Sequence, residues 1–214
     1  MTIPSFDAGS GTRGSILIDV ATGNAFSAAP GGGSTPALNV SSDGLKATYQ
    51  YSVSGFTPVA TPTAMVIIKG SATKTVRIKR IRLAGVATAQ GNMKVQSASW
   101  STAGTLGSAA LTALTAVKHD PNDAAATCTV STVGTANYTT EGTGSTVPML
   151  CDRLFMGVTA TGIITPNEFN FSTRNDKALI LRGTSDIIAI SGAGSAVPSG
   201  GVIDISIELE EDNS

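Results

Sequence analysis

The segment at residues 202–210 places the strongest constraint on how this chain folds. It alternates aliphatic residues with polar and acidic ones, namely Ile203, Ile205, Ile207 and Leu209 against Asp204, Ser206, Glu208 and Glu210. A two-residue period puts all the aliphatic side chains on one side of a sheet, whereas a helix would scatter them around its circumference. The sequence therefore predicts a strand with one buried and one solvated face, which completes a β core.

Shorter runs of the same kind recur along the chain, separated by Gly, Ser, Thr, Pro and Asn. They predict further strands at 49–53, 65–68, 75–83, 93–100, 127–133, 154–158, 168–171, 178–181 and 187–191. Strands at such intervals are typical of sandwiches and barrels. One or two helical turns are expected at 109–114, too few to organise the fold. We therefore expect an all-β domain over residues 47–214.

The first 46 residues differ from the rest in composition. Glycines at 9, 11 and 14 and the run 31–36 interrupt this segment around a single short apolar stretch at 16–20. Gly-rich chain loses much backbone entropy on ordering and offers little apolar area in return. We expect residues 1–46 to form an extended Gly-rich N-terminal arm that is ordered only by a neighbour. The start of the chain shows no secretory signal pattern, which indicates synthesis in a cytoplasm.

The charge content excludes some classes of function. The chain has 14 Lys plus Arg against 15 Asp plus Glu, a net charge of −1, and 14% charged residues in all. Globular domains usually carry about 25% charged residues. The near-neutral balance argues against a nucleic-acid binder, and no apolar run approaches the roughly 20 residues that span a membrane. A surface with so few charges favours partial burial in an oligomer.

The basic segment at 75–83 contains two apolar phases. Val76 and Ile78 share one phase of a two-residue period, and Ile81 and Leu83 share the other. A β-bulge near Lys79 and Arg80 would bring both pairs to the same face.

The same strand gathers Arg77, Lys79, Arg80 and Arg82. We favour a solvated face or cross-strand pairing with acidic residues, for which Asp204, Glu208 and Glu210 are available. An anion or nucleic-acid site is the alternative.

Histidine and carboxylates cluster only at His119-Asp-Pro-Asn-Asp123. Asp120, Asn122 and Asp123 carry oxygen ligands of the type that a hard cation prefers. The same residues are good turn formers, and Ala124 to Ala126 follow where a calcium loop would add another acidic ligand. We favour a plain loop. His119 is the sole histidine and no nucleophile elbow is present, so we expect no catalytic, cofactor-binding or metal-binding residues and no enzyme activity.

Four other features of the sequence have structural interpretations. Cys128 and Cys151 are interpreted as reduced structural thiols, with a disulfide left open because pairing depends on geometry. The run 192–195 resembles a phosphate loop but lacks the Lys-Ser/Thr ending, so we expect a hairpin turn. Residues 182–184 are expected to form a turn between strands. Trp100 is the only tryptophan, which argues against an aromatic platform for sugars.

Five motifs occur in a fixed order and carry a resemblance to a known family: 79–85 (KRIRLAG), 111–120 (LTALTAVKHD), 121–126 (PNDAAA), 177–184 (KALILRGT) and 198–208 (PSGGVIDISIE). Over roughly residues 65–210 the chain resembles tailed-bacteriophage and prophage virion proteins of the capsid-decoration or head-fibre type. The arm before Lys46 lies outside this resemblance.

The resemblance implies a jelly-roll-like antiparallel β-sandwich that associates as a trimer. It also implies attachment to the major capsid protein on the outside of an icosahedral capsid, after synthesis in the host cytoplasm. The family has no catalytic residues to transfer to this sequence. A tail or tail-fibre component, including a host-recognition module, is the alternative, although the long repetitive shaft usual in fibres is absent.

Overall fold

The computed structural model describes residues 46–108, 110–134, 136–144, 151–158, 166–171 and 178–213, so the expected arm lies outside the described residues apart from Lys46. Every regular element in these ranges is a β-strand, which confirms the all-β prediction. The strands are β1 (Ala47–Phe56), β2 (Ala64–Lys69), β3 (Lys74–Ala87), β4 (Gly91–Trp100), β5 (Thr105–Leu106), β6 (Leu111–Ala113), β7 (Val117–Lys118), β8 (Thr129–Val133), β9 (Tyr138–Thr140), β10 (Cys151–Val158), β11 (Asn167–Asn170), β12 (Leu179–Arg182), β13 (Ile187–Ser191) and β14 (Val202–Asn213).

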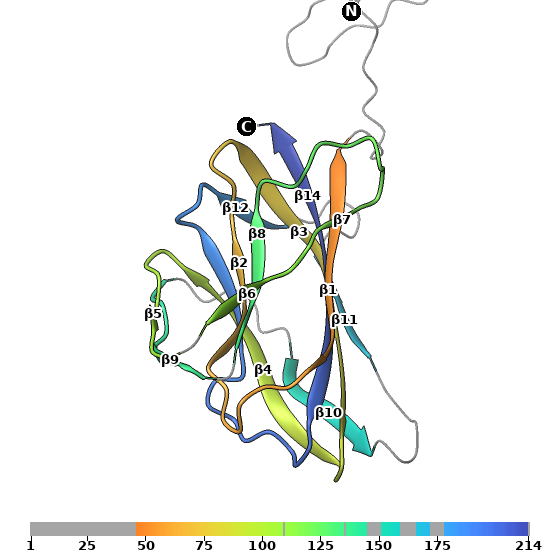
Figure 1. The fold of residues 1–214 in the computed structure, drawn as a ribbon, viewed down its shortest axis with the longest axis vertical. Helices are drawn as coiled ribbons and strands as arrows, with labels where there is room; N and C mark the ends of the chain where they lie inside the picture. The colour runs from red at the N-terminus through yellow and green to blue at the C-terminus, as the bar shows by residue number, and fades with distance from the viewer. Residues whose placement is uncertain are drawn as a thin grey trace, which may run out of the picture. The chain divides into compact units, whose positions relative to one another are not determined.

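Most of these strands belong to one large curled sheet (Figure 1). Its order is β6-β8-β2-β13-β4-β10-β3-β14-β1-β7, with β11 and β12 also paired to β3. We call β3, β14, β1, β7, β11 and β12 the first half, and β6, β8, β2, β13 and β4 the second half. Strand β10 joins them, because it pairs antiparallel with β4 and parallel with the end of β3. The sheet is therefore mixed, whereas a purely antiparallel arrangement was expected.

Strand β14 occupies the middle of the first half, between β1 and β3. Its four aliphatic residues, Ile203, Ile205, Ile207 and Leu209, are at most 2% exposed. The side chains that alternate with them are on the outer face and retain solvent contact. The predicted strand with one buried and one solvated face is confirmed.

The expected bulge in the basic strand is present at Lys79. Opposite β14, Arg80 pairs with Glu208 and Ile78 pairs with Leu209, which leaves Lys79 as an extra residue on β3. The backbone carbonyl of Lys79 accepts a hydrogen bond from the Phe171 N–H instead. Both apolar phases of the strand are thereby buried on one face.

The two halves enclose the main hydrophobic core, to which β1, β2, β3, β4, β10, β13 and β14 all contribute. A second, smaller cluster lies on the opposite side of the second half and includes Ile67, Trp100, Tyr138 and Ala189. Strands β5 and β9 form a separate two-stranded sheet, from which Tyr138 packs edge-on against Trp100 at a centroid distance of 5.4 Å. Strand β2 is consequently apolar and buried from Ala64 to Ile68, because both of its faces are covered.

The prediction of a helical turn at 109–114 was wrong. Leu111–Ala113 is strand β6, which pairs with β8 at one edge of the curled sheet, while residue 109 is outside the described residues. Strand β7 begins four residues after the end of β6, and it pairs with β1 at the other edge of the sheet. Residues 114–116 therefore connect the two edges of the sheet. Pairing with β8 outweighs the weak local helix preference of this Ala- and Leu-containing stretch.

Candidate functional site

The 119–123 loop is a turn that satisfies its own polar groups. Asp120 Oδ1 accepts a 2.9 Å hydrogen bond from the Asn122 N–H, and the Asp123 N–H donates to the Asp120 carbonyl. The Lys118 ammonium donates to the Asp123 carbonyl at 2.6 Å, so a cation is already built into the loop. Within the described ranges, no group of three or more His, Cys, Asp or Glu is placed to hold a metal. The turn that these residue types predicted is therefore present.

The basic side chains of β3 are paired with carboxylates on the outer face of the first half. Arg80 Nη2 lies 2.6 Å from Glu208 Oε2, and Glu210 lies 3.6 Å from Arg77 Nε and 3.7 Å from Lys79 Nζ. The predicted cross-strand pairing is confirmed for Glu208 and Glu210. Such partly exposed pairs contribute about 0–1 kcal/mol each, and they leave little unbalanced charge for an anion.

Two details of this charged face differ from the prediction. The Asp204 carboxylate bonds to β1 rather than to a basic side chain of β3: its Oδ1 accepts hydrogen bonds from Ser54 Oγ at 2.9 Å and from the Gly55 N–H at 2.7 Å. Arg82 pairs with Glu168 of β11 at 3.4 Å, whereas an acidic residue of β14 was predicted as its partner. Strand β11 is therefore fastened to β3 by charge as well as by its ladder.

Glu211 is a buried carboxylate that sequence reasoning missed. Its side chain is fully enclosed. Oε1 accepts hydrogen bonds from the N–H groups of Thr127 at 2.8 Å and Cys128 at 2.7 Å, and Oε2 accepts one from Thr127 Oγ1 at 2.9 Å. The Lys74 ammonium lies 3.4 Å away. The alternation of the strand could have revealed it, since Glu211 lies two residues after Leu209 and therefore on the same buried face.

Burial and hydrogen bonding set the protonation of this buried cluster. Burial by itself would raise the pKa of Glu211, but the hydrogen bonds from Cys128 and Thr127 outweigh it and lower that pKa. Burial raises the pKa of the Cys128 thiol to about 12, and burial followed by the hydrogen bond to Cys128 raises the pKa of Tyr51. Cys128 is a free, buried thiol, as predicted, while the side chain of Cys151 lies outside the described residues. We interpret this cluster as structural, because its groups are enclosed and hydrogen-bond to one another.

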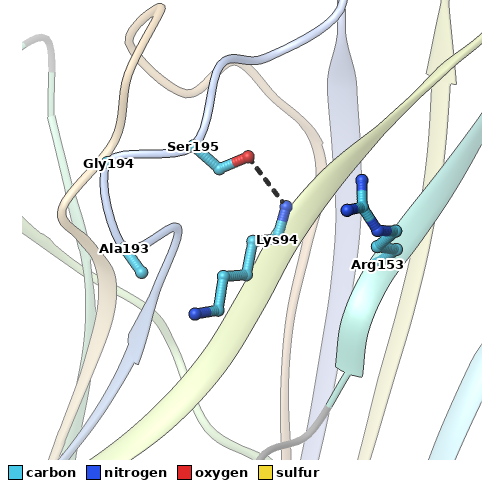
Figure 2. A pocket seen from close by; sticks show the side chains of 5 residues that line it. All are labelled: Lys94, Arg153, Ala193, Gly194 and Ser195. Atoms are coloured by element: carbon cyan, nitrogen blue, oxygen red, sulfur yellow. Dashed lines mark hydrogen bonds between the residues drawn. The ribbon is translucent and has the colours of Figure 1, made fainter.

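A shallow, mostly polar pocket of about 460 Å³ lies where β4, β10 and the turn after β13 meet. It is lined by Lys94, Arg153, Ala193, Gly194 and Ser195 (Figure 2). The Lys94 backbone N–H donates a 3.1 Å hydrogen bond to Ser195 Oγ, which fixes the turn against β4. Two cationic side chains from different strands thus border one solvent-accessible hollow.

The remaining motifs are structural. Trp100 is 3% exposed and cannot serve as a platform for sugars. Residues 182–184 form the expected turn, in which Gly183 adopts a φ of 90°. The turn at 192–195 is not a hairpin, because β13 pairs with β2 and β4 whereas β14 pairs with β3 and β1. It begins a crossover between the two halves.

Comparison of the chain with protein-family models, curated proteins and solved structures gave no match. Over the described residues there is no helix of the length and apolarity needed to cross a bilayer.

Proposed function

We propose that this chain is a structural protein of a bacteriophage virion, which binds the major capsid protein on the outer capsid surface as an oligomer. The observation that carries the proposal is the ordered set of five motifs, which resemble those of capsid-decoration proteins. A trimer that contacts several capsid subunits at once would stabilise the shell, because linked modest contacts bind strongly together.

The placement of the motifs supports their acting as a unit. Motif 79–85 lies in β3, and motif 198–208 leads into β14, which pairs with β3 along its length. The part of motif 177–184 that forms β12 pairs with β3 as well. Motif 111–120 begins in β6 of the second half and continues through β7, which pairs with the β1 strand that flanks β14. Segments more than 100 residues apart along the chain are therefore neighbours in one half of the sheet.

The finer fold is part of the same proposal, namely a jelly-roll-like sandwich. The chain passes from β1 in the first half to β2 in the second, back to β3, and over again to β4. It crosses again between β6 and β7, between β7 and β8, between β12 and β13, and between β13 and β14. Repeated crossing between two facing layers that share a core is the pattern of jelly rolls.

The test uses the full chain and empty capsids of the phage whose genome encodes it. Light scattering behind a sizing column gives the mass of the free protein, and co-sedimentation gives its binding to capsids. We expect a trimer that saturates capsids at a fixed stoichiometry and raises the temperature at which the shell ruptures. A trimer that ignores capsids but binds isolated tails would replace decoration with a tail function. A monomer that binds neither would overturn the virion proposal.

A further inference from the structure

The pocket in Figure 2 is bordered by two cationic side chains, Lys94 of β4 and Arg153 of β10. Across the described side chains, the ion pairs engage Lys46, Lys74, Arg77, Lys79, Arg80 and Arg82, all on or beside the first half. Lys94 and Arg153 have no described carboxylate within ion-pair distance. No described carboxylate therefore balances their positive charge at this pocket, in contrast with the charged face of β3 and β14.

Backbone pairing holds these two side chains on one face. Lys94 lies on β4 next to Met93, which pairs with Leu154 of β10. Leu154 and Met93 are buried, whereas Arg153 is exposed and Lys94 is partly exposed. Both cations therefore project from the outer side of the β4–β10 junction. The register of the sheet, rather than chance proximity of two loops, brings them together.

Ser195 adds a hydroxyl group to the same pocket. Its Oγ accepts the Lys94 N–H, and within the described part of the chain its own proton has no acceptor, so the proton is available to a ligand. The turn that presents Ser195 contains Ala193 at a φ of 49°, the one described non-glycine residue with a positive φ. The turn is held in this conformation by hydrogen bonds from the Ala193 N–H to Ser191 Oγ and from the Gly194 N–H to the Pro62 carbonyl.

An exposed aromatic side chain lies beside the pocket. Phe155 is 41% exposed, although it belongs to a strand whose neighbouring residues Leu154 and Met156 are fully buried. It projects from the same face of β10 as Arg153, two residues away. Arginine and aromatic residues together are characteristic of protein–protein contacts. The surroundings of the pocket therefore match a protein ligand better than a free ion.

We propose that Lys94, Arg153 and Ser195 form a binding site for the carboxylate of an acidic side chain of a partner protein, with Phe155 contacting an adjacent apolar residue. Arginine can donate two parallel hydrogen bonds to a carboxylate, while Lys94 and Ser195 offer further donors. The inference goes beyond the proposed function, because it specifies a ligand chemistry and holds whatever the partner is.

The test follows backbone amide shifts of the deuterated, ¹⁵N-labelled full chain at low ionic strength, where surface charge is least screened. The probes are acetyl-Glu-Leu-amide, acetyl-Gln-Leu-amide and inorganic phosphate. We expect the Glu peptide to shift Lys94, Phe155 and Ser195 saturably, with a dissociation constant below about 10 mM. The Gln peptide and the K94Q/R153Q variant should each bind about ten-fold more weakly or worse.

A matched control variant is K69Q/R182Q, which removes one Lys and one Arg that also lack described ion-pair partners but lie outside the pocket. It should bind the Glu peptide as the unmodified chain does. Equal binding of the Glu and Gln peptides, unchanged binding by K94Q/R153Q, or no saturable shift with the Glu peptide would each overturn the site. Tighter binding of phosphate than of the Glu peptide would overturn its assignment to carboxylates.

Discussion

Glu211 Oε1 accepts a 2.7 Å hydrogen bond from the backbone N–H of Cys128, although the two residues are 83 positions apart in the chain. The bond joins the end of β14 in the first half to the segment that enters β8 in the second half. Thr127 donates to the same carboxylate with both its N–H and its hydroxyl. A single buried side chain therefore supplies acceptors to backbone groups that no strand partner satisfies.

Replacing Glu211 should destabilise the fold more than replacing its neighbour on the outer face. We expect Glu211→Gln to lower the free energy of unfolding by about 2–3 kcal/mol, because the amide NH₂ would face a donor in an enclosed site. The control is Glu210→Gln, which removes only partly exposed ion pairs and should cost less than about 1 kcal/mol. Urea denaturation of both variants measures the difference. Equal losses would contradict the structural role of Glu211.

The contribution of Glu211 should depend on pH. Its pKa is lower in the folded protein than the ordinary value of 4.5, so the folded state favours the carboxylate. The stabilisation is therefore complete above about pH 5 and is lost as the pH falls below 4.5 through the lowered folded pKa. The stability difference between the unmodified chain and Glu211→Gln should shrink over that range in denaturation curves recorded at successive pH values. A difference that stays constant down to pH 2 would refute this linkage.

Deletion of Lys79 should be tolerated, whereas deletion of Arg82 should not. Without Lys79 the strand reads Val-Arg-Ile-Arg-Ile-Arg-Leu, which keeps every aliphatic residue on the buried face and removes the bulge opposite β14. We expect this deletion to lower the free energy of unfolding by about 1–2 kcal/mol, because the hydrogen bond from the Phe171 N–H to the Lys79 carbonyl is lost. Deletion of Arg82 would place Ile81 and Leu83 on opposite faces and should cost at least 3 kcal/mol, roughly the burial of one or two large side chains. Thermal melts followed by circular dichroism distinguish the two deletions.

The Tyr51 hydroxyl should stabilise the contact between β1 and the start of β8. It donates a 3.2 Å hydrogen bond to the Cys128 carbonyl inside the core. Tyr51→Phe leaves that carbonyl without its side-chain donor and should lower the free energy of unfolding by about 1 kcal/mol. Val53→Ala, farther along the same strand and only partly buried, controls for a general weakening of β1. A Tyr51→Phe variant as stable as the unmodified chain in urea would show that the bond contributes nothing.

Cys128 should resist alkylation in the folded protein. Its thiol is buried and its pKa is raised to about 12, so almost none of it is the reactive thiolate at pH 8. In a Cys151→Ser background, iodoacetamide should modify Cys128 roughly a thousand-fold more slowly in buffer than in denaturant. Mass spectrometry of timed samples measures both rates. Similar rates in the two conditions would contradict the burial of this thiol.

The elements predicted well from the sequence are those in which side-chain parity decides the structure. The alternation from Ile203 to Leu209 specified a strand, and the phase change between Ile78 and Ile81 specified a bulge near Lys79. In both cases the requirement to bury aliphatic groups on one face determines the backbone. The pairing of Glu208 with Arg80 followed from the same reasoning, since opposite charges on one face of neighbouring strands meet.

The elements missed depend on contacts that parity does not report. The stretch 111–113 has no strong strand pattern and becomes β6 only because the edge of β8 accepts it. Asp204 lies in the acidic phase of β14, yet its side chain is bonded to Ser54 and Gly55, where the register of β1 shifts. The pocket at Lys94 and Arg153 arises from the pairing of β4 with β10, which are distant in sequence and carry no joint motif.

The position of β14 between β1 and β3 bears on how the protein is made. A ribosome releases β1 and β3 long before residues 202–213, yet the slot between those two strands stays unfilled until β14 arrives. Until residues 202–213 are made, the nascent chain therefore exposes two unpaired strand edges and the apolar side chains that β14 covers. Closure that depends on such distant pairing is slow. Truncated products should accumulate as aggregates, and chaperone supply should limit the yield of this protein more than its final stability does.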